Sequence, residues 1–381
     1  MKQVCRKLAL SAVSILLTAL LLEILIRVTG MVAPYGYPPG LFASDPDTGY
    51  RYAANFPAAP FVKQEFATRV FTNSDGFRDT ERTRGKSDHK RYLVVGDSFV
   101  WAAYGVDLEG AFTMLAEKQL SELSQEPCEV VNAGVVGWGT DNALAFLQAN
   151  WDRYQPDGVV LSFCIANDFF DNLRTGEYMV KDGYLVESDS ARADGPIRKL
   201  RNFTVKHSRL AVLVERGLYE LDFLKPILKK QESIRFHGKD QMRALYNINE
   251  PEQAALRGKT FDLLKAMKAL CDVHGVPLAL LPIPTKVQVP YMGPADEEVE
   301  AGVELSQQQL YSPQSAIEGM CEELGIDYFE TLEALKTASQ DAPVFWELNP
   351  HFNAYGNQVV ADVLTQSLYT QFLKGSESPE E

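Results

Sequence analysis

From residue 91 onward, short apolar segments alternate with stretches of helical pattern, and this alternation constrains the fold more than any other feature. The apolar segments, each expected to be a strand, lie at residues 91–95, 129–132, 158–164, 278–281 and 327–329. Helices are expected between and after them, near residues 111–123, 141–154, 260–273, 313–324 and 354–372. Apolar strands separated by helices are typical of a parallel sheet that is covered on both faces. We therefore predict an α/β fold built on a central parallel sheet.

The segment before this alternation differs in composition. Residues 31–48 are rich in Pro, Gly and Tyr and are expected to be a linker, the first part of an N-terminal extension that covers residues 31–90. An alternating stretch at residues 66–72 is followed by turn residues at 73–76, and the two together predict a hairpin. The α/β domain itself is expected to occupy residues 91–373.

A long insertion at about residues 171–259 interrupts the alternation. It carries more Lys and Arg than Asp and Glu, although the whole chain has a formal net charge of −14. Residues 209–228 place apolar side chains at helical spacing, so we expect a helical insertion that packs on the core. The alternatives are a lid over a site, or a face that rests on anionic lipid or an anionic polymer. The polar residues 374–381 are expected to be a disordered tail.

The first 30 residues predict a membrane anchor. Three basic residues precede an uncharged run of residues 8–22, and the apolar stretch extends through Ile26 despite Glu23. Its roughly 19 residues are about enough to cross the bilayer core. The preceding cations keep that end cytoplasmic, so the body is expected to be extracytoplasmic, in the periplasm or on the cell surface. A cleavable signal peptide is the alternative, because the uninterrupted part of the run is short.

Charge and composition exclude several kinds of partner and site. The strongly negative net charge argues against a nucleic-acid binder, which needs a basic face. The histidines outside the motif below form no ligand cluster, the glycines at 134, 137 and 139 lack phosphate-loop spacing, and the five cysteines fit no metal spacing. We therefore expect no metal and no organic cofactor. A disulfide between Cys271 and Cys321 remains open.

Four short segments carry residues that acyl-transfer chemistry needs. They are Gly96-Asp97-Ser98-Phe99, Asn132-Ala133-Gly134-Val135-Val136-Gly137, Ala166-Asn167-Asp168 and His351-Phe352-Asn353. Each of the first three follows an expected strand, and the fourth precedes the closing helix. Ligands of a parallel α/β sheet bind at the carboxyl ends of its strands, so we expect the four segments to meet there. Together they supply a nucleophile, oxyanion donors and a base.

In their order and spacing these segments resemble the four blocks of the SGNH (GDSL-type) hydrolases. The residues that give that family its name are matched by Ser98, Gly137, Asn167 and His351. The resemblance covers residue 91 to the last helix, with one large insertion, and implies a flavodoxin-like three-layer α/β/α sandwich. The anchor, the segment at residues 73–78 and the His351-Phe352-Asn353 ending are similar to those of membrane-anchored bacterial members.

The resemblance implies a role for each of these residues. Ser98 attacks an ester carbonyl and becomes acylated, while His351 takes its proton and returns it to the leaving alcohol. The backbone N–H groups of Ser98 and Gly137 and the side-chain amide of Asn167 stabilise the oxyanion. Asp97 is expected to brace the nucleophile loop without taking part in the chemistry.

The chain departs from the family pattern beside the histidine. The family usually has an Asp two or three residues before it, but those positions hold Asn349 and Leu348, and the nearest carboxylate is Glu347. An Asn can orient an imidazole but carries no charge. Either Asn349 or Glu347 is therefore expected to orient His351, and the sequence leaves the choice open.

The residues support three hypotheses about function. The first is an exported, membrane-anchored serine esterase that removes acetyl or other short acyl groups from a carbohydrate, a lipid or a small ester. The second is an O-acyltransferase that uses the same residues but transfers the acyl group to an envelope or secreted polysaccharide. The third is a weakly active or inactive member that binds glycan and acts as a scaffold.

Overall fold

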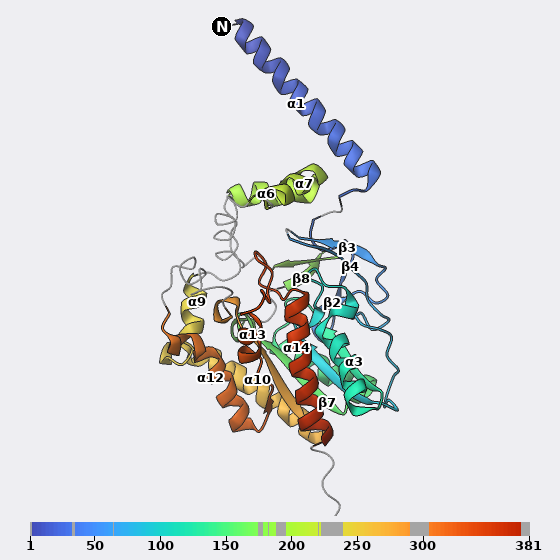
Figure 1. Cartoon of the computed structure of the whole chain (residues 1–381), viewed down its shortest axis with the longest axis vertical. Coiled ribbons are helices and arrows are strands. Elements are labelled where there is room, and N and C mark those ends of the chain that lie inside the picture. The colour runs from blue at the N-terminus through green and yellow to red at the C-terminus, as the bar shows by residue number, and fades with distance from the viewer. Residues whose placement is uncertain are drawn as a thin grey trace, which may run out of the picture.

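The structure, a computed structural model, describes residues 2–32, 35–63, 65–173, 178–181, 183–187, 196–219, 221, 239–289 and 305–374. Of the expected tail at residues 374–381, all but the first residue lie outside this described part. The predicted alternation of strands and helices is confirmed from β5 (Lys90–Gly96) to α14 (Ala354–Ser367) (Figure 1).

The core of the molecule is a sheet of five parallel strands. These are β5 (Lys90–Gly96), β6 (Cys128–Gly134), β7 (Gly158–Cys164), β10 (Leu278–Ile283) and β11 (Asp327–Tyr328). Their spatial order is β11-β10-β7-β5-β6, and every neighbouring pair is parallel. Numbered along the chain this is the order 2-1-3-4-5, which is the flavodoxin-like order. The predicted fold class is therefore confirmed.

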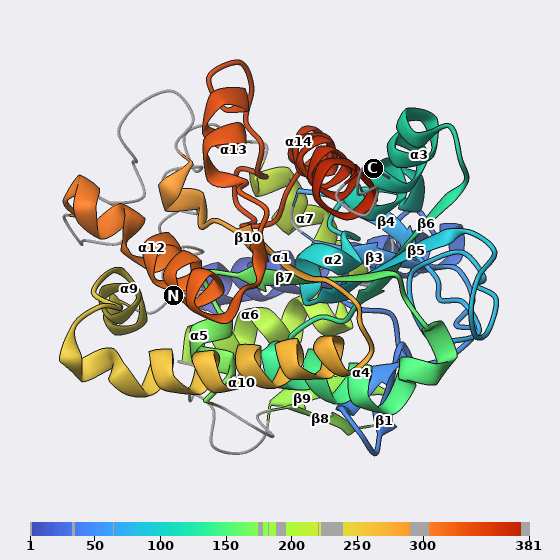
Figure 2. The same ribbon diagram turned by 90° about the horizontal axis from the view of Figure 1, so that it is seen from below.

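Helices cover both faces of the sheet (Figure 2). One face carries α3 (Phe112–Ser124), α13 (Leu332–Ala338) and α14 (Ala354–Ser367), and the other carries α4 (Thr140–Tyr154), α10 (Ala254–Val273) and α12 (Gln307–Leu324). Successive strand residues point to opposite faces. In β5, Leu93 and Val95 thus join the core under α4 and α10, whereas Tyr92 and Val94 join the core under α3 and α14.

Two helices begin earlier than the sequence pattern predicts. Helix α12 starts at Gln307 because Ser306 caps it, accepting from the backbone N–H of Gln309, whose side chain accepts in return from the backbone N–H of Ser306. Pro313, which the prediction took as the start, lies inside the helix. Helix α10 starts at Ala254, directly after a short 3₁₀ turn at Pro251–Gln253.

The N-terminal extension is folded against the domain. It forms two hairpins, β1 (Phe42–Asp45) with β2 (Gly49–Tyr52), and β3 (Ala59–Val62) with β4 (Ala67–Val70). The alternating stretch at residues 66–72 therefore does hold a strand, but its partner precedes it. The residues 73–76 form a separate turn, in which the N–H of Gly76 donates to the carbonyl of Asn73.

Buried aromatic rings pack the N-terminal extension against the α/β domain. The indole ring of Trp101 lies 5.2 Å from the ring of Phe61 and 5.4 Å from the ring of Tyr52. All three side chains are fully buried in one core cluster. The extension is thus part of the hydrophobic core beside the segment that follows β5.

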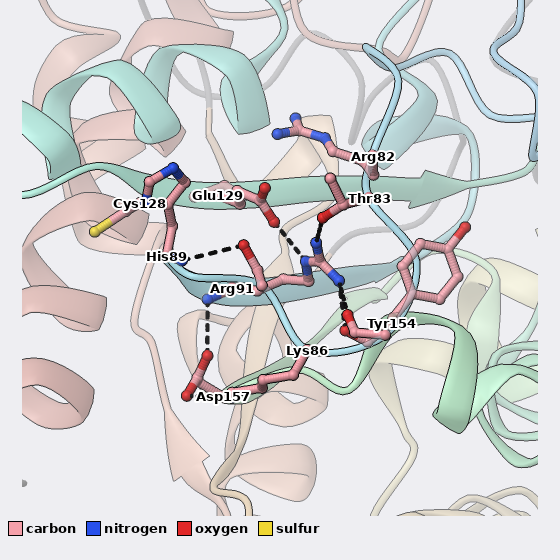
Figure 3. Close-up of polar contacts among 12 residues, drawn as sticks. Arg82, Thr83, Lys86, His89, Arg91, Cys128, Glu129, Tyr154 and Asp157 are labelled. Carbon is pink, nitrogen blue, oxygen red and sulfur yellow. Dashed lines mark hydrogen bonds and ion pairs between the residues drawn. The ribbon is translucent and has the colours of Figure 1, made fainter.

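A buried arginine ties the start of the sheet to the segment before it (Figure 3). Arg91 Nε donates to Glu129 Oε2 at 2.5 Å, and its Nη1 donates to the carbonyl oxygens of Gly85 and Tyr154 at 2.8 and 2.6 Å. Its Nη2 donates to Thr83 Oγ1 at 2.8 Å. Because the guanidinium is fully buried, these bonds replace those it would make with water.

The insertion divides into parts with different contacts. The hairpin of β8 (Tyr178–Lys181) and β9 (Tyr184–Glu187) lies beside β1 and β2, and α9 (Lys239–Tyr246) buries Met242, Leu245 and Tyr246 in the main core. By contrast, α6 (Pro196–His207) and α7 (Arg209–Tyr219) lie beside the end of α1 (Lys2–Thr29), between it and the body (Figure 1). The expectation of packing on the core therefore describes α9 and not α6 or α7.

Helix α1 projects away from the rest of the molecule (Figure 1). Its segment Gln3–Thr29 is 27 residues long and apolar enough to cross a membrane, and it is the one such helix in the described part of the chain. A signal sequence would have the same properties. Elsewhere, Cys271 and Cys321 are both buried free thiols, so the disulfide that the sequence left open is not formed.

Candidate active site

The nucleophile candidate lies at the turn from strand to helix after β5. Strand β5 ends at Gly96, and the one-turn helix α2 (Ser98–Trp101) follows at once. The Asp97 carboxylate caps this helix by accepting from the backbone N–H of Phe99 at 2.8 Å. Ser98 therefore stands at the carboxyl edge of the sheet, held by the cap of its own helix.

The base candidate reaches Ser98 from the far end of the chain. His351 Nε2 lies 2.8 Å from Ser98 Oγ, although 253 residues separate the two. His351 is placed by the start of α14, which Asn353 caps by accepting from the backbone N–H of Gly356 at 3.0 Å. The imidazole stacks on the ring of Tyr104 at 3.5 Å with 5° between the planes, which fixes its orientation.

Asn349 orients the imidazole. Its Oδ1 lies 2.6 Å from His351 Nδ1 and also accepts from the backbone N–H of His351 at 3.1 Å. A backbone N–H can only donate, so this network assigns the atom as the amide oxygen and places a proton on Nδ1. The other nitrogen, Nε2, is then the acceptor that faces Ser98.

Of the two candidate orienters, the structure places Asn349 and not Glu347 against the imidazole. Both ring nitrogens of His351 are engaged by other residues, Nδ1 by Asn349 Oδ1 and Nε2 by Ser98 Oγ. The side chain that orients His351 is thus an uncharged amide, whereas the hydrolases that the sequence resembles usually have an Asp there.

Glu65 is a supporting residue that sequence reasoning missed. Its Oε2 accepts from the backbone N–H groups of Leu348 and Asn349, at 2.8 Å each. It lies in the turn between β3 and β4, more than 280 residues before the loop that it holds. Burial raises the pKa of this carboxyl. No local pattern identifies Glu65, because its role depends on the extension folding over the domain.

Gly137 lies in the loop that follows β6, the strand beside β5. Its φ of +78° lies in the region that favours glycine, and a Cβ there would lie 2.9 Å from the hydroxyl of Tyr50. Two tyrosines of β2 hold this loop: Tyr50 donates to the carbonyl of Val136 at 3.1 Å, and Tyr52 accepts from the N–H of Val136 at 3.0 Å. The loop geometry therefore requires a glycine.

Asn167 approaches the nucleophile through Asp97. It follows β7 and precedes α5 (Asp168–Asp171), and its Nδ2 donates to Asp97 Oδ2 at 3.3 Å. Ser98 Oγ lies 3.5 Å from the same carboxylate oxygen. Ser98, Asn167 and His351 thus gather around one point, and Gly137 follows the neighbouring strand.

Two buried carboxyl groups, Asp97 and Asp168, follow the neighbouring strands β5 and β7. Asp168 Oδ2 accepts from the backbone N–H of Cys164 at 2.9 Å. The pKa values of Asp97 and Asp168 are both raised, first by burial and, for Asp168, next by the charge of Asp97. The contacts of Asp97 are with the nucleophile turn and Asn167, so it braces the site and does not serve as the base.

The imidazole of His351 is uncharged in the folded protein. His351 exposes only 8% of its surface, and burial, with a further contribution from the charge of Lys63, lowers its pKa to about 3. The neutral ring is therefore the form present at pH 7, and its Nε2 can accept a hydrogen bond from Ser98 Oγ. Within the described ranges, no group of three or more His, Cys, Asp or Glu side chains could hold a metal ion.

Known proteins give distant structural matches. No family model and no curated protein matches the sequence. Among solved structures, TesA matches with a TM-score of 0.41 and 14% identity, covering 74% of this chain and 99% of its own. The esterase EstA from Pseudoalteromonas sp., in a structure inhibited by monoethylphosphonate, matches with a TM-score of 0.38 and 14% identity over 75% of this chain and 99% of its own.

The acetyl xylan esterase AlAXEase matches with a TM-score of 0.38 and 12% identity, over 73% of this chain and 99% of its own. Similarities this distant say nothing about the substrate of this chain, and the strand order by itself establishes the fold. The solved structures that the chain resembles thus include esterases.

Proposed function

We propose that the chain is a serine esterase of the SGNH (GDSL) type that acts through an acyl-enzyme. One observation carries the proposal: Ser98 Oγ, His351 and Asn349 are linked by contacts of 2.8 and 2.6 Å at the carboxyl edge of the sheet. A hydroxyl within reach of a neutral imidazole, itself oriented by a third group, is the arrangement that activates a serine nucleophile.

The residues divide the reaction between them. His351 Nε2 takes the proton as Ser98 Oγ attacks the ester carbonyl, and it then gives the proton to the leaving alcohol. The developing oxyanion accepts hydrogen bonds from the N–H groups of Ser98 and Gly137 and from the Asn167 amide. Water, activated by His351 in the same way, then releases the acyl group from Ser98.

We further propose that the acyl group is short, with acetyl as the first choice. The support is steric: Ser98 exposes only 7% of its surface, and the rings of Phe99 and Tyr104 flank His351. A long acyl chain would need these side chains to move.

Membrane anchoring through α1 is also part of the proposal. Its length and apolar surface support a single span, and the basic residues at its start support a cytoplasmic N-terminus. The catalytic domain would then be extracytoplasmic.

O-acyl transfer is the second candidate, and the burial of Ser98 favours it. An acyl-enzyme with little exposure to water survives long enough to meet a sugar hydroxyl. The inactive-scaffold hypothesis gains no support from the geometry, because an inactive protein has no need of the contact between Ser98 and His351.

Hydrolysis of p-nitrophenyl acetate and butyrate by the full chain in detergent, beside Ser98→Ala, tests the proposal. Turnover that is lost in the variant, with acetate preferred to butyrate, is the expected result. Equal rates for the two proteins in folded samples would contradict it. Acetate recovered on an added oligosaccharide, in place of free acetate, would identify transfer.

A further inference from the structure

Helices α6 and α7 make direct polar contacts with the last turns of α1. The Glu23 carboxylate accepts from the backbone N–H groups of Arg209 and Leu210 at 3.0 and 2.8 Å, at the start of α7. In return, Arg27 Nη2 donates to the carbonyl of His207, at the end of α6, at 2.6 Å. The two helices are therefore fixed to α1 at the junction between them.

An apolar cluster joins the same three helices to the extension. Ile26 and Val32, at and after the end of α1, are buried with Val205 of α6, Val212 of α7 and Val62 of β3. The contact between α1 and the helix pair is thus built from both hydrogen bonds and apolar packing.

The opposite surface of the pair exposes large apolar side chains. On α7, Val214 and Leu218 are four residues apart and share a face, with exposed Leu213 beside it. On α6, exposed Leu200 and Phe203 are three residues apart. Phe203 and Leu200 are more than 60% exposed. On the surface of soluble proteins, exposed apolar residues usually occur singly, whereas a group of them on one element indicates an interaction surface.

The pair of helices α6 and α7 is positively charged, unlike the chain as a whole. The sequence of residues 196–219 contains six Lys or Arg and one Glu, although the whole chain has a net charge of −14. Helices that combine an apolar face with Lys and Arg bind in the interface of anionic membranes.

The position along α1 fits a membrane interface. The 27 residues of Gln3–Thr29 span about 40 Å, whereas the bilayer core is about 30 Å thick. Glu23 and Arg27 therefore lie where α1 leaves the core. Their charges pair with each other at 2.5 Å, and backbone groups of α6 and α7 satisfy the remaining hydrogen bonds. Figure 1 shows α6 and α7 across this end of α1 and not along it.

From these observations we infer that α6 and α7 form an interfacial membrane-binding element that inserts its apolar face among anionic phospholipids. The inference rests on the proposed anchoring by α1. It also orients the active site: Val62 packs in the cluster with Ile26, and Glu65, three residues later, holds the Asn349 backbone. The carboxyl edge of the sheet therefore faces the bilayer.

The test uses the full chain in vesicles of three parts phosphatidylcholine to one part phosphatidylglycerol. Single cysteines carry a nitroxide label in a Cys5→Ser background, since the other native thiols are buried. Val214→Cys and Leu218→Cys report on the element. Leu16→Cys, at a position 69% exposed in α1, reports on the anchor, and Val273→Cys, at a position 82% exposed on α10, is the matched water-facing control. Circular dichroism verifies that each variant is folded.

The readout is collision of the label with oxygen, which concentrates in lipid, and with a water-soluble nickel chelate. Labels at Val214 and Leu218 are expected to meet oxygen and to be protected from nickel, as at Leu16, whereas the label at Val273 shows the reverse. Nickel access at Val214 equal to that at Val273 would overturn the inference. Protection of the Val214 label from both oxygen and nickel would also overturn it, because the label would then be covered by protein and not by lipid.

Two further outcomes separate the parts of the inference. If the Leu16 label is open to nickel, the anchoring itself fails and the interfacial element fails with it. If the Leu16 label is in lipid and the Val214 label is in water, only the element fails. In phosphatidylcholine alone, nickel access at Val214 is expected to rise, and equal access in both compositions would overturn the role of charge.

Discussion

Placing a carboxylate beside His351 is expected to increase the activity of the protein. In the structure, Asn349 Oδ1 lies 2.6 Å from His351 Nδ1 and already fixes the tautomer. The amide has no net charge, however, so it stabilises the positive charge that forms on the ring less than a carboxylate would. The change Asn349→Asp supplies that charge at the same position.

The size of the gain follows from two opposing terms. Opposite charges about 4 Å apart at an effective dielectric constant of about 20 attract by about 4 kcal/mol. Burial opposes this attraction, because Asn349 lies in a nearly water-free site next to the Glu65 carboxylate and an ionised Asp there loses its hydration. We expect a net gain of about 1.4 to 2.7 kcal/mol, which is roughly a 10- to 100-fold increase in kcat/KM.

The assay is p-nitrophenyl acetate hydrolysis by the full chain across pH, with Asn349→Leu as the matched control. A carboxylate raises the pKa of His351, so the acid limb of the profile should move to higher pH while the plateau rises. The Leu variant, which cannot hold the tautomer, should fall below the parent. A shifted acid limb with no rise in the plateau would refute the reasoning, and so would a limb that does not move.

Three further predictions follow from the geometry. Gly137→Ala should lower kcat for p-nitrophenyl acetate by about 10²-fold, because the Cβ of the alanine would displace the loop that supplies an oxyanion donor. A decrease in kcat of less than threefold would contradict this role. Arg91→Ala should lower the free energy of unfolding by about 3 kcal/mol in urea titrations, because it leaves the partly buried Glu129 carboxylate and the carbonyls of Gly85 and Tyr154 without their donor. Lys86→Ala, at an exposed ion pair, should cost at most about 1 kcal/mol. Because burial lowers the pKa of His351 to about 3, its ring should stay neutral in the folded protein below pH 6. The contribution of this residue to stability should then fall as the pH decreases from the unfolded pKa of about 6.5 toward 3. An imidazole NMR signal of His351 that titrates near pH 6.5 in the folded protein would contradict the lowered pKa.

The parallel sheet and the meeting of the four segments could be predicted because both follow from local patterns. Apolar runs mark buried strands, and the carboxyl ends of parallel strands share one edge, so Ser98 and Asn167 had to lie near each other. The placement of His351 depended on the resemblance to a known family, since nothing in its own neighbourhood specifies a partner 253 residues away.

What the sequence did not predict depends on contacts between distant segments. The choice of Asn349 over Glu347 depends on the conformation of the loop before α14, and Glu65 contacts that loop only because the extension folds over the domain. The apolar pattern of α7 predicted a helix correctly, but a buried face and a lipid-facing one have the same periodicity. The apolar pattern therefore could not show that α7 packs against α1 and not against the core of the α/β domain.

Covalent capture of Ser98 tests the central claim most directly. The full chain in detergent is treated with a fluorophosphonate, digested and analysed by mass spectrometry, beside Ser98→Ala and His351→Ala. The account predicts one adduct on the peptide that contains Ser98, absent from the first variant and formed far more slowly in the second. No adduct on Ser98 in the folded wild-type chain, or equal rates with and without His351, would contradict the proposal that His351 activates Ser98 as a nucleophile.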